Sequence, residues 1–291
     1  MQSVALICQP VLIEARRLAE ECAKVVEAEG YLPRLLSAWE LSGEADISQV
    51  RLAMTFGGDG TIIRAARWLA GSGVPILGVA MGKLGFLTEL PPETACASIP
   101  SVLAGNFWRD ERSMLSARLG PAPDAGEAVS EDPAADRADA GPGARLIALN
   151  DVVVARGASP RVVQIDLSID GTPVASYVAD GLVVSTPTGS TAYALAAGGP
   201  VMAPEVQGIL LVPIAAHLAV LRSLVVPLSA HMEIRASSDQ PAYLVLDGQV
   251  QIPVKNQQPI WVEVARERTL FARLGSRSHF YQTLVQSLKK R

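Results

Sequence analysis

The first third of the chain alternates short apolar runs with segments of helical periodicity. Continuous apolar runs predict buried strands over Ser3 to Cys8, Leu52 to Phe56 and residues 74–79. Between them, apolar positions at helical spacing predict a helix from Leu12 to Glu29 and another from about Thr61 to Leu69. Strands that alternate with helices indicate βαβ units around a parallel sheet. This part is therefore predicted to be a Rossmann-like α/β domain.

After Phe107 the pattern changes to successive strand-like runs with turns between them. The runs begin with SMLSARL at residue 113 and end with IWVEVAR at residues 260–266. Two dipeptides between them, Asp170-Gly171 and Asp247-Gly248, are typical of hairpin turns. This part is predicted to be an all-β, sandwich-like domain. The last amphipathic segment, SHFYQTLVQSLKK, predicts a helix that packs back on the body.

The predicted fold class is therefore α/β + β. We place the α/β domain at residues 1–106, rejoined by the closing helix at 277–291, and the β-rich domain at 107–276. Residues 120–144 interrupt the β-rich domain with six acidic residues, one basic residue and a single large aliphatic side chain. Such a segment cannot bury enough apolar surface to offset the entropy of ordering it, which predicts a disordered insertion.

Composition and charge exclude several classes of protein. The chain of 291 residues carries a net charge of −4, and subtracting the −5 of the insertion leaves +1, which argues against a nucleic-acid-binding protein. No apolar run approaches the roughly 20 residues that span a bilayer. The N-terminus lacks the basic lead of a secretory signal, and the three cysteines show no CxxC spacing. We expect a reduced, cytoplasmic protein with no membrane partner.

A glycine-rich tetrapeptide separates the second predicted strand from the next helix. It consists of Gly57, Gly58, Asp59 and Gly60. Ligands of open parallel sheets bind at the carboxyl ends of strands, and glycines before a helix N-terminus let backbone N–H groups approach phosphate oxygens. A carboxylate repels phosphate, so Asp59 is better suited to accept a hydroxyl proton or to bind Mg²⁺ beside the phosphate. The alternative is that Asp59 only caps the helix.

Two common phosphate-binding motifs are missing. The chain has no GxxxxGK[ST], since the nearest approach, GVAMGKL at residues 78–84, has only three residues between its glycines. GGDGTI lacks the third glycine of GxGxxG. Neither a P-loop NTPase nor an ordinary dinucleotide oxidoreductase is indicated.

A second unusual stretch, YVADGLVVSTPTGSTAYALAAGGP at residues 177–200, is rich in hydroxyl groups. Hydroxyls and backbone amides at Thr188, Ser190 and Thr191 can hydrogen-bond sugar or phosphate groups, and Tyr193 offers a ring on which a base can stack. A polar loop between strands is the structural alternative. The density of hydroxyls followed by small residues favours a dedicated binding site.

A third candidate is the pair Asn150 and Asp151, which interrupts a predicted strand. Both side chains can accept hydrogen bonds from amines or ribose hydroxyls. A β-bulge or the start of a strand explains the pair equally well. Asp247 is explained by the hairpin turn alone. The three histidines lie far apart with no ligand spacing, so the sequence fixes no metal site.

Together these motifs resemble those of the NAD kinase family. GGDGT, LGFL, the Asn–acidic pair, DGLVVSTPTGSTAY followed by AGGP, and DGQ occur in the family's order and cover nearly the whole chain outside residues 120–144. GGDGT alone also occurs in diacylglycerol and sphingosine kinases and some phosphofructokinases, whereas TPTGSTAY with AGGP is specific. Members of the family transfer the γ-phosphoryl group of ATP, or sometimes of polyphosphate, to the 2′-hydroxyl of the adenosine ribose of NAD.

The resemblance implies roles for individual residues. Asp59 would be the proton acceptor, with Gly60 beside it in the substrate site. Asn150 and Asp151 would bind NAD, and Asp180 would hold the far end of the dinucleotide. Gly57, Gly58 and Gly60 would bind phosphate, and the other implied substrate-binding residues are Arg64, Phe86, Arg161, Thr188, Thr191, Ala192, Tyr193 and Gln249.

The resemblance also implies a cofactor and partners. A divalent metal, Mg²⁺ or Mn²⁺, would arrive with the phosphoryl donor. NAD and ATP would be the substrates, and the protein would form a homodimer or homotetramer. Two alternatives stay open: a lipid kinase of the GGDGT superfamily, which would need an apolar acyl pocket where STPTGSTAY is polar, and a non-catalytic NAD(P) sensor, which would have no need for Asp59.

Overall fold

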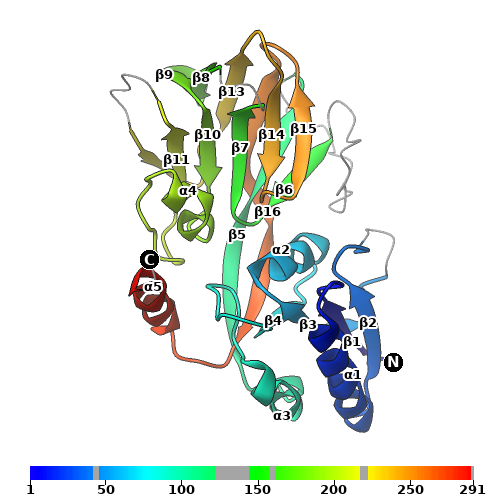
Figure 1. Cartoon of the computed structure of the whole chain (residues 1–291). Coiled ribbons are helices and arrows are strands. Elements are labelled where there is room, and N and C mark those ends of the chain that lie inside the picture. Colours follow the sequence, from blue (N-terminus) through cyan, green and yellow to red (C-terminus); the bar gives the residue numbers. More distant parts are fainter. Residues whose placement is uncertain (42–45, 122–143, 158–160, 217–221, 290–291) are drawn as a thin grey trace. The chain divides into compact units, whose positions relative to one another are not determined.

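The computed structural model describes residues 1–41, 46–121, 144–157, 161–216 and 222–289 (Figure 1). The chain divides into two compact units, the first formed by Met1–Arg112 with Arg268–Arg291 and the second by Ser113–Glu267. Strands β5 (Trp108–Leu119) and β16 (Pro259–Arg273) each contribute to both units. The division therefore falls inside these two long strands, a few residues from the boundaries expected at 106 and 276. Of the predicted insertion at 120–144, only the ends lie within the described residues.

The first unit is a parallel sheet with helices on both faces. Its strands lie in the order β2-β1-β3-β4, and the end of β16 pairs with β4. All of these pairs are parallel, which confirms the Rossmann-like prediction. Its elements, besides the two shared strands, are β1 (Ser3–Cys8), α1 (Ile13–Ala28), β2 (Leu32–Ser37), β3 (Val50–Gly57), α2 (Asp59–Trp68), β4 (Pro75–Ala80), α3 (Pro92–Leu103) and α5 (His279–Lys289).

Two elements of this unit have no clear signal in the sequence. Strand β2 is the edge of the sheet, where its residues are half-buried or exposed and leave no continuous apolar run. Helix α3 follows Pro91, begins at Pro92 and contains Pro100, and proline is expected to interrupt rather than form a helix interior. Burial of one side of α3 against the sheet outweighs that penalty.

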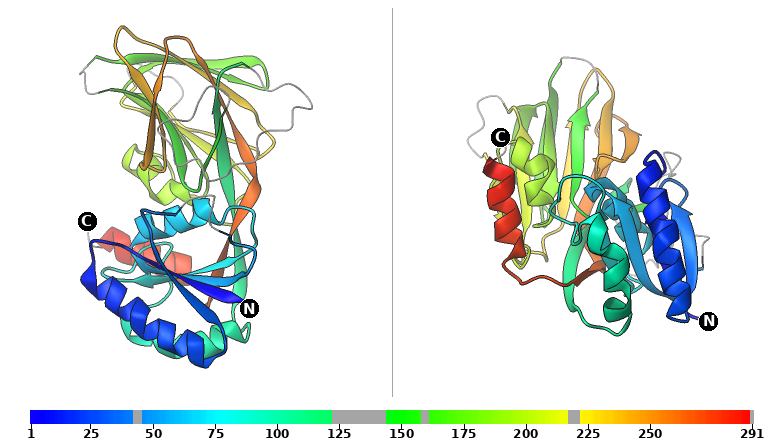
Figure 2. Two further views of the ribbon diagram at one scale, coloured as in Figure 1. Left: turned by 90° about the vertical axis from the view of Figure 1, so that its right-hand side faces the viewer. Right: turned by 60° about the horizontal axis from the view of Figure 1, so that its bottom comes forward.

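The two faces of the sheet are covered differently. Helices α1 and α3 lie on one face and α2 lies on the other (Figure 2). Leu52, Met54 and Phe56 of β3 are buried in one cluster with α1 and α3. Because successive side chains of a strand point to opposite faces, Thr55 points toward the α2 side. Thr55 is fully buried, and its hydroxyl has no hydrogen-bond partner among the described residues.

The second unit consists of two antiparallel sheets packed face to face. One has the order β12-β11-β10-β7-β14-β15, and the other contains β16-β13-β8-β9 with β5 and β6. Val184 and Leu244 of the first sheet share one buried cluster with Ile165 and Ile234 of the second, which confirms the predicted sandwich.

The elements of this second unit follow one another closely along the chain. They are β6 (Arg145–Ala148), β7 (Asp151–Arg156), β8 (Val163–Ile169), β9 (Thr172–Ala179), β10 (Gly181–Ser185), η1 (Gly189–Thr191), α4 (Tyr193–Ala196), β11 (Ile209–Ile214), β12 (Leu224–Val226), β13 (Met232–Ser237), β14 (Ala242–Leu246) and β15 (Val250–Val254).

Both predicted hairpin turns are present. Asp170-Gly171 joins β8 to β9, and Asp247-Gly248 joins β14 to β15. All four residues have positive φ, at 49°, 77°, 52° and 64° in chain order. Two successive positive-φ residues match the right-handed twist of the flanking strands, and Asp and Gly tolerate that conformation.

The closing helix α5 belongs to the first unit. The ring of Phe280 lies 6.1 Å from the ring of Phe86, measured between centroids, and Thr283 is buried. The helix is therefore placed against the LGFL segment that precedes α3.

Because the buried hydroxyl of Thr55 has no partner among the described residues, its removal is predicted to stabilise the protein, whereas most substitutions destabilise. Thr55→Val replaces a buried hydroxyl that has no partner with a methyl group of the same shape, and we expect the free energy of unfolding to rise by about 1 kcal/mol. Thr88 is equally buried, but its hydroxyl accepts the Gly85 N–H at 2.8 Å. Thr88→Val should therefore destabilise by roughly 1–3 kcal/mol. Urea unfolding of both variants tests the contrast, and a loss of stability in Thr55→Val would contradict it.

Candidate functional site

The GGDG tetrapeptide lies where β3 ends and α2 begins. Gly57 is the last residue of β3, Gly58 occupies the N-cap position of α2, and Asp59 is the first residue of the helix. A Cβ on Gly57 would collide with the Thr61 side chain, so only glycine fits at this point. Gly58 and Gly60 are exposed at the positive end of the helix, an arrangement suited to binding an anion.

The Asp59 side chain bonds a turn far away in the sequence. The N-cap residue of α2, Gly58, makes no side-chain cap hydrogen bond. Oδ2 of Asp59 accepts the Phe86 N–H at 3.1 Å, and Oδ1 accepts the Leu87 N–H at 3.2 Å. Gly85 packs against the same carboxylate, where a Cβ would collide with it. Asp59 thus fixes the turn that carries the LGFL motif.

The surroundings of Asp59 make it a stronger base than an ordinary aspartate. Burial raises the pKa of Asp59, while the backbone hydrogen bonds from Leu87 and Phe86 and the charge of Arg273 lower it in part, leaving the pKa above its ordinary value. A raised pKa increases the affinity of the carboxylate for a proton. Each carboxylate oxygen also keeps a lone pair beyond the one used by its backbone donor.

A buried arginine supports this turn from the other side. Arg273 donates to the carbonyl oxygen of Leu87 at 3.0 Å, to Glu89 Oε2 at 3.1 Å and to Asp110 Oδ2 at 3.0 Å. Asp110 also pairs with Arg112. Burial raises the pKa of Asp110, but the bonds and charges of the two arginines outweigh it and hold the pKa below its usual range. Arg273 was not among the predicted site residues, because nothing in LFARLG distinguishes it.

Two other residues predicted for this unit, Arg64 and Phe86, lie near Asp59 in the structure. Arg64 is half-buried in α2, and Phe86 is half-buried in the turn, with its ring tilted at 46° against Phe280. Phe86 is brought next to Asp59 by the hydrogen bond of its backbone, and Arg64 follows Asp59 in the same helix.

In the second unit, three motifs far apart in the sequence meet at one end of β7, β10 and β14 (Figure 1). The Thr186 hydroxyl donates to the Leu149 carbonyl at 2.7 Å, and the Thr186 N–H donates to the Asn150 carbonyl at 2.9 Å. Gly189 lies so close to the backbone of Asn150 that a Cβ there would collide with its carbonyl oxygen. The Asn–Asp pair and the hydroxyl-rich segment are therefore interlocked.

The third motif contributes the carboxylate of Asp247. It accepts the backbone N–H groups of Leu149 at 2.9 Å, Asn150 at 2.7 Å and Asp151 at 3.2 Å. The Asp247 N–H in turn donates to the Asp151 carbonyl at 3.0 Å. The predicted hairpin explains the backbone of Asp247 but not this role of its side chain, which sequence analysis missed. Gln249 is half-buried in the same turn, and its N–H donates to the Leu246 carbonyl.

Asp151 is buried close to the Asp247 carboxylate. Burial and, to a lesser extent, the negative charge of Asp247 raise the pKa of Asp151 from 3.8 to about 7, against a hydrogen bond from the Tyr193 backbone that lowers it. The carboxyl group of Asp151 therefore titrates near neutral pH. In its protonated form it can donate a hydrogen bond as well as accept one.

The hydroxyl-rich segment divides into groups used by the fold and groups left for a ligand. Ser190 is fully buried; its hydroxyl donates to the Pro187 carbonyl at 2.7 Å and accepts the Met202 N–H at 2.9 Å. Its predicted contact with a sugar or phosphate is not available in this arrangement. Thr191 donates to the Thr188 carbonyl at 3.2 Å.

Exposure to solvent increases along the segment from Thr188 to Tyr193. Thr188 is largely buried, Thr191 and Ala192 are half-buried, and Tyr193 is 45% exposed at the start of α4. A half-exposed tyrosine ring beside Asp151 can stack with a planar ligand. The structure brings these residues together with the Asn–Asp pair and the DGQ turn.

Two predicted residues lie elsewhere in this unit. Asp180 precedes β10 and forms an ion pair with Arg156, at the end of β7 opposite to Asp151. Arg161 pairs with Asp239 at 3.7 Å on the exposed surface. Both are separated from the Asn–Asp pair by the length of β7 and β10.

Within the described ranges, no three His, Cys, Asp or Glu side chains gather as they would around a metal ion. Among the helices that the structure describes, none is both long and apolar enough to cross a membrane.

Comparison with known proteins identifies the family. The profile of the ATP-NAD kinase N-terminal domain matches residues 38–107, and that of the ATP-NAD kinase C-terminal domain matches residues 149–274. An NAD kinase of Dehalococcoides mccartyi is 35% identical over 289 residues, covering 99% of this chain and 96% of the relative. One of Chloroflexus aggregans is 33% identical over 291 residues, covering 100% and 99%. The chain belongs to the NAD kinase family.

Solved structures agree with membership of the NAD kinase family, which is a family of phosphotransferases. The crystal structure of a yeast NADH kinase with NADH has a TM-score of 0.81 at 24% identity and covers 99% of this chain and 88% of its own. That of an Archaeoglobus fulgidus NAD kinase with ATP has a TM-score of 0.75 at 24% identity, covering 97% and 98%. At this level of identity, the two structures confirm the fold of an NAD kinase.

The raised pKa of Asp151 predicts how the stability of the protein depends on pH. The folded protein holds the proton more tightly than the unfolded chain, so the stabilisation is complete below pH 3.8 and is lost as the pH rises through about 7. Asp151→Asn has no proton to lose. We expect its stability relative to wild type to rise over this window by on the order of 4 kcal/mol, at about 1.4 kcal/mol for each unit of pKa difference.

Urea unfolding of both proteins between pH 4 and pH 8 measures the change. Asp239→Asn, which removes an exposed carboxyl from the same unit, controls for the loss of one negative charge. NMR titration of the Asp151 side-chain carbon gives the midpoint directly. A midpoint below pH 5, or parallel pH profiles for wild type and Asp151→Asn, would contradict the prediction.

Proposed function

We propose that this chain transfers the γ-phosphoryl group of ATP to the 2′-hydroxyl of the adenosine ribose of NAD, giving NADP and ADP. The observation that carries the proposal is the Asp59 carboxylate, which lies at the carboxyl end of β3 next to exposed Gly58 and Gly60 and has a raised pKa. The family membership of the chain supports the reaction class. The relatives named as NAD kinases, and the solved structures that hold NADH and ATP, support the substrates.

In the proposed reaction, the first unit supplies the base and the phosphate site. The ribose 2′-oxygen forms a bond to the γ-phosphorus, the bond from that phosphorus to the β,γ-bridging oxygen breaks, and Asp59 takes the hydroxyl proton. Backbone N–H groups of Gly57, Gly58 and Gly60 and the start of α2 bind phosphate oxygens. Arg64 adds a positive charge from the same helix. Such a reaction depends mainly on positioning and on charge neutralisation, which these groups provide.

A divalent cation, Mg²⁺ or Mn²⁺, belongs to the same proposal. The lone pairs that remain on the Asp59 oxygens fit a water molecule of a hydrated cation, since Mg²⁺ keeps several of its waters. When bound with the donor, the cation would neutralise negative charge on the phosphates.

In the second unit, the interlocked motifs are proposed to hold the dinucleotide. Asn150 and Asp151 hydrogen-bond its adenosine part, and a partly protonated Asp151 can donate to an acceptor as well as accept from a hydroxyl. The exposed ring of Tyr193 stacks on a base. Asp180, at the other end of β10, is proposed to bind the far end of the dinucleotide. The remaining residues proposed to contact substrate are Phe86, Arg161, Thr188, Thr191, Ala192 and Gln249.

The proposal extends to the state of the protein in the cell. We propose a cytoplasmic homodimer or homotetramer, in line with the composition of the chain and the family that it belongs to. Light scattering of the purified protein measures the mass of the assembly.

Substitution of Asp59 tests the reaction. We expect Asp59→Asn to lower kcat for NADP formation from NAD, ATP and Mg²⁺ by at least about 10²-fold, because a positioned base typically contributes that much. The Kd for NAD should change little. Because Asp59 also holds the LGFL turn, Thr88→Val is the matched control: it disturbs the same turn and leaves the carboxylate in place.

The outcomes separate the alternatives. Equal losses of kcat in Asp59→Asn and Thr88→Val would assign Asp59 a purely structural role. Tight NAD binding by the wild type without turnover on ATP or polyphosphate would make the protein a sensor. Phosphorylation of a lipid hydroxyl, with none of NAD, would make it a lipid kinase.

A further inference from the structure

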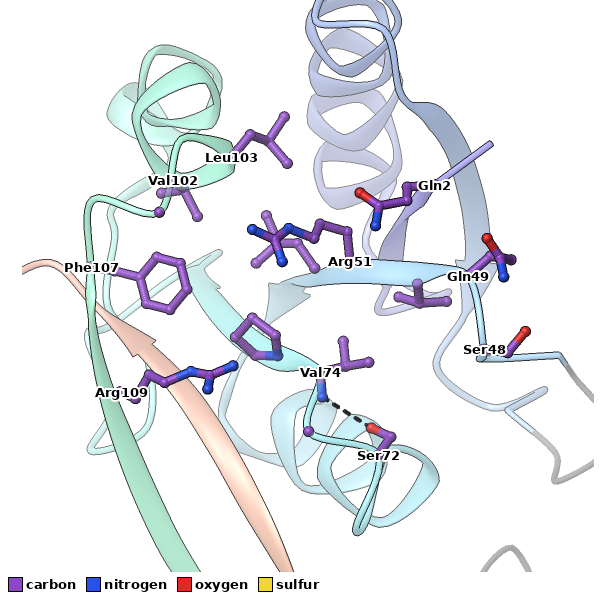
Figure 3. A pocket seen from close by; sticks show the side chains of 15 residues that line it. Gln2, Ser48, Gln49, Arg51, Ser72, Val74, Val102, Leu103, Phe107 and Arg109 are labelled. Carbon is purple, nitrogen blue, oxygen red and sulfur yellow. Dashed lines mark hydrogen bonds between the residues drawn. The ribbon is translucent and has the colours of Figure 1, made fainter.

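A cavity of about 390 Å³ lies in the first unit at the amino ends of the parallel strands (Figure 3). Its walls come from the beginnings of β3 and β4, the end of α3 and the start of β5. GGDG lies at the other end of β3, and none of its residues lines this cavity. The cavity is therefore distinct from the phosphate site proposed above.

Two arginines extend into this cavity from different strands. Arg51 comes from β3 and Arg109 from β5, and both side chains extend toward the space beside the ring of Phe107 (Figure 3). No Asp or Glu is among the residues that line it. Within the described part of the chain, neither guanidinium has a hydrogen bond or an ion pair. By contrast, the nearby Arg112 and Arg273 are both paired with Asp110.

The rest of the wall is mixed, with polar side chains such as Gln2 beside an apolar part around Phe107. The half-buried ring of Phe107 is joined by Val74, Val102 and Leu103. A simple inorganic anion makes no favourable contact with an apolar surface, whereas a planar ring of a ligand is stabilised by contact with an aromatic side chain. The volume is at the small end of the roughly 300–1,000 Å³ that small-molecule sites occupy.

Helix capping does not account for the arginines. Helices α2 and α3 both end beside the cavity, and cations are favourable at the negative ends of helices. However, a carbonyl at each of these helix ends already has a donor: Leu69 accepts from Ser72, and Val102 accepts from the Gly105 N–H. Neither arginine donates to a described carbonyl. Both arginines are exposed to solvent, and within the described residues their charges border the cavity without a protein partner.

We propose that this cavity binds a small aromatic anion, meaning one aromatic or heteroaromatic ring that carries a phosphate or carboxylate group. Arg51 and Arg109 bind the anionic group, for which the planar guanidinium is well suited, and Phe107 contacts the ring. The site is separate from phosphoryl transfer and does not rest on the proposed function.

Calorimetric titration of the full chain tests this with simple probes. Phenyl phosphate is the main probe, benzoate distinguishes a carboxylate from a phosphate, and inorganic phosphate and benzyl alcohol each carry only half of the proposed ligand. We expect phenyl phosphate or benzoate to bind at least tenfold more tightly than either half, and binding to weaken with salt. Equal affinity of inorganic phosphate and phenyl phosphate would overturn the proposal.

Variants locate the binding. The double variant Arg51→Gln/Arg109→Gln should weaken binding of the better probe at least tenfold. Arg17→Gln, which removes one exposed charge from α1 of the same unit, should leave it unchanged. Asp59→Asn should leave it unchanged as well, which separates this site from the GGDG site. Equal binding by the double variant and wild type would refute the assignment.

Two further readouts do not depend on variant affinity. Amide NMR signals of wild-type protein should shift on titration at Arg51, Val74 and Phe107, and shifts confined to residues 57–60 would overturn the proposal. Light scattering of the double variant covers a remaining possibility. If assembly size changes while probe affinity does not, the arginines contact another copy of the chain and the proposal fails.

Discussion

Backbone amides held by carboxylates from distant parts of the chain are the interaction on which both halves of this protein depend. Asp59 accepts two N–H groups from the turn at residues 85–88, and Asp247 accepts three from residues 149–151. A charged acceptor makes a stronger hydrogen bond than a neutral one, and each carboxylate oxygen can accept more than one donor. Each carboxylate therefore fixes a whole turn without any regular secondary structure.

These contacts explain where glycine is required. Gly85 packs on the Asp59 carboxylate and Gly189 on the Asn150 carbonyl, and in both places a Cβ would occupy the space of the oxygen. The close approach also has an electrostatic consequence. Burial of Asp151, reinforced by the negative charge that Asp247 holds at the turn, drives the Asp151 carboxyl toward its neutral form, with a pKa of about 7. One structural carboxylate thus contributes to the protonation of a neighbour that faces the proposed dinucleotide site.

Features that depend on neighbouring residues could be predicted from the sequence, whereas contacts between residues far apart in the chain could not. Strands and helices of the first third, both Asp-Gly hairpins and the closing helix follow from periodicity and turn chemistry, which act over a few residues. Edge strand β2 and the proline-bearing α3 do not, because tertiary burial decides them. In the same way, GGDG and the Asn–Asp pair stand out as motifs, but Asp247 was explained fully by its turn. Its second role depends on Leu149, which lies 98 residues away.

Ser190 was predicted to contact a ligand and does not, whereas Arg273 was not predicted and has a structural role. A serine inside a hydroxyl-rich segment was expected to face a ligand, yet its hydroxyl closes the loop from Pro187 to Met202. Arg273 ends a long strand with no distinguishing neighbours, yet it joins Leu87, Glu89 and Asp110 beneath the LGFL turn. Residue type predicts which chemistry is possible, and only the fold decides whether the backbone or a ligand uses it.

The two ends of the parallel strands offer different chemistry to an anion. At the carboxyl ends, α2 presents its positive end and the glycines of GGDG present N–H groups, so a phosphate site needs few side chains. At the amino ends of the strands the helices present their negative ends, where a carbonyl of each helix already has a donor. An anion can bind there only if side chains supply the positive charge, and two do so in the cavity that Arg51 and Arg109 line. Because the strands are parallel, an anion at their carboxyl ends is bound by backbone N–H groups, whereas an anion at their amino ends must be bound by arginine side chains.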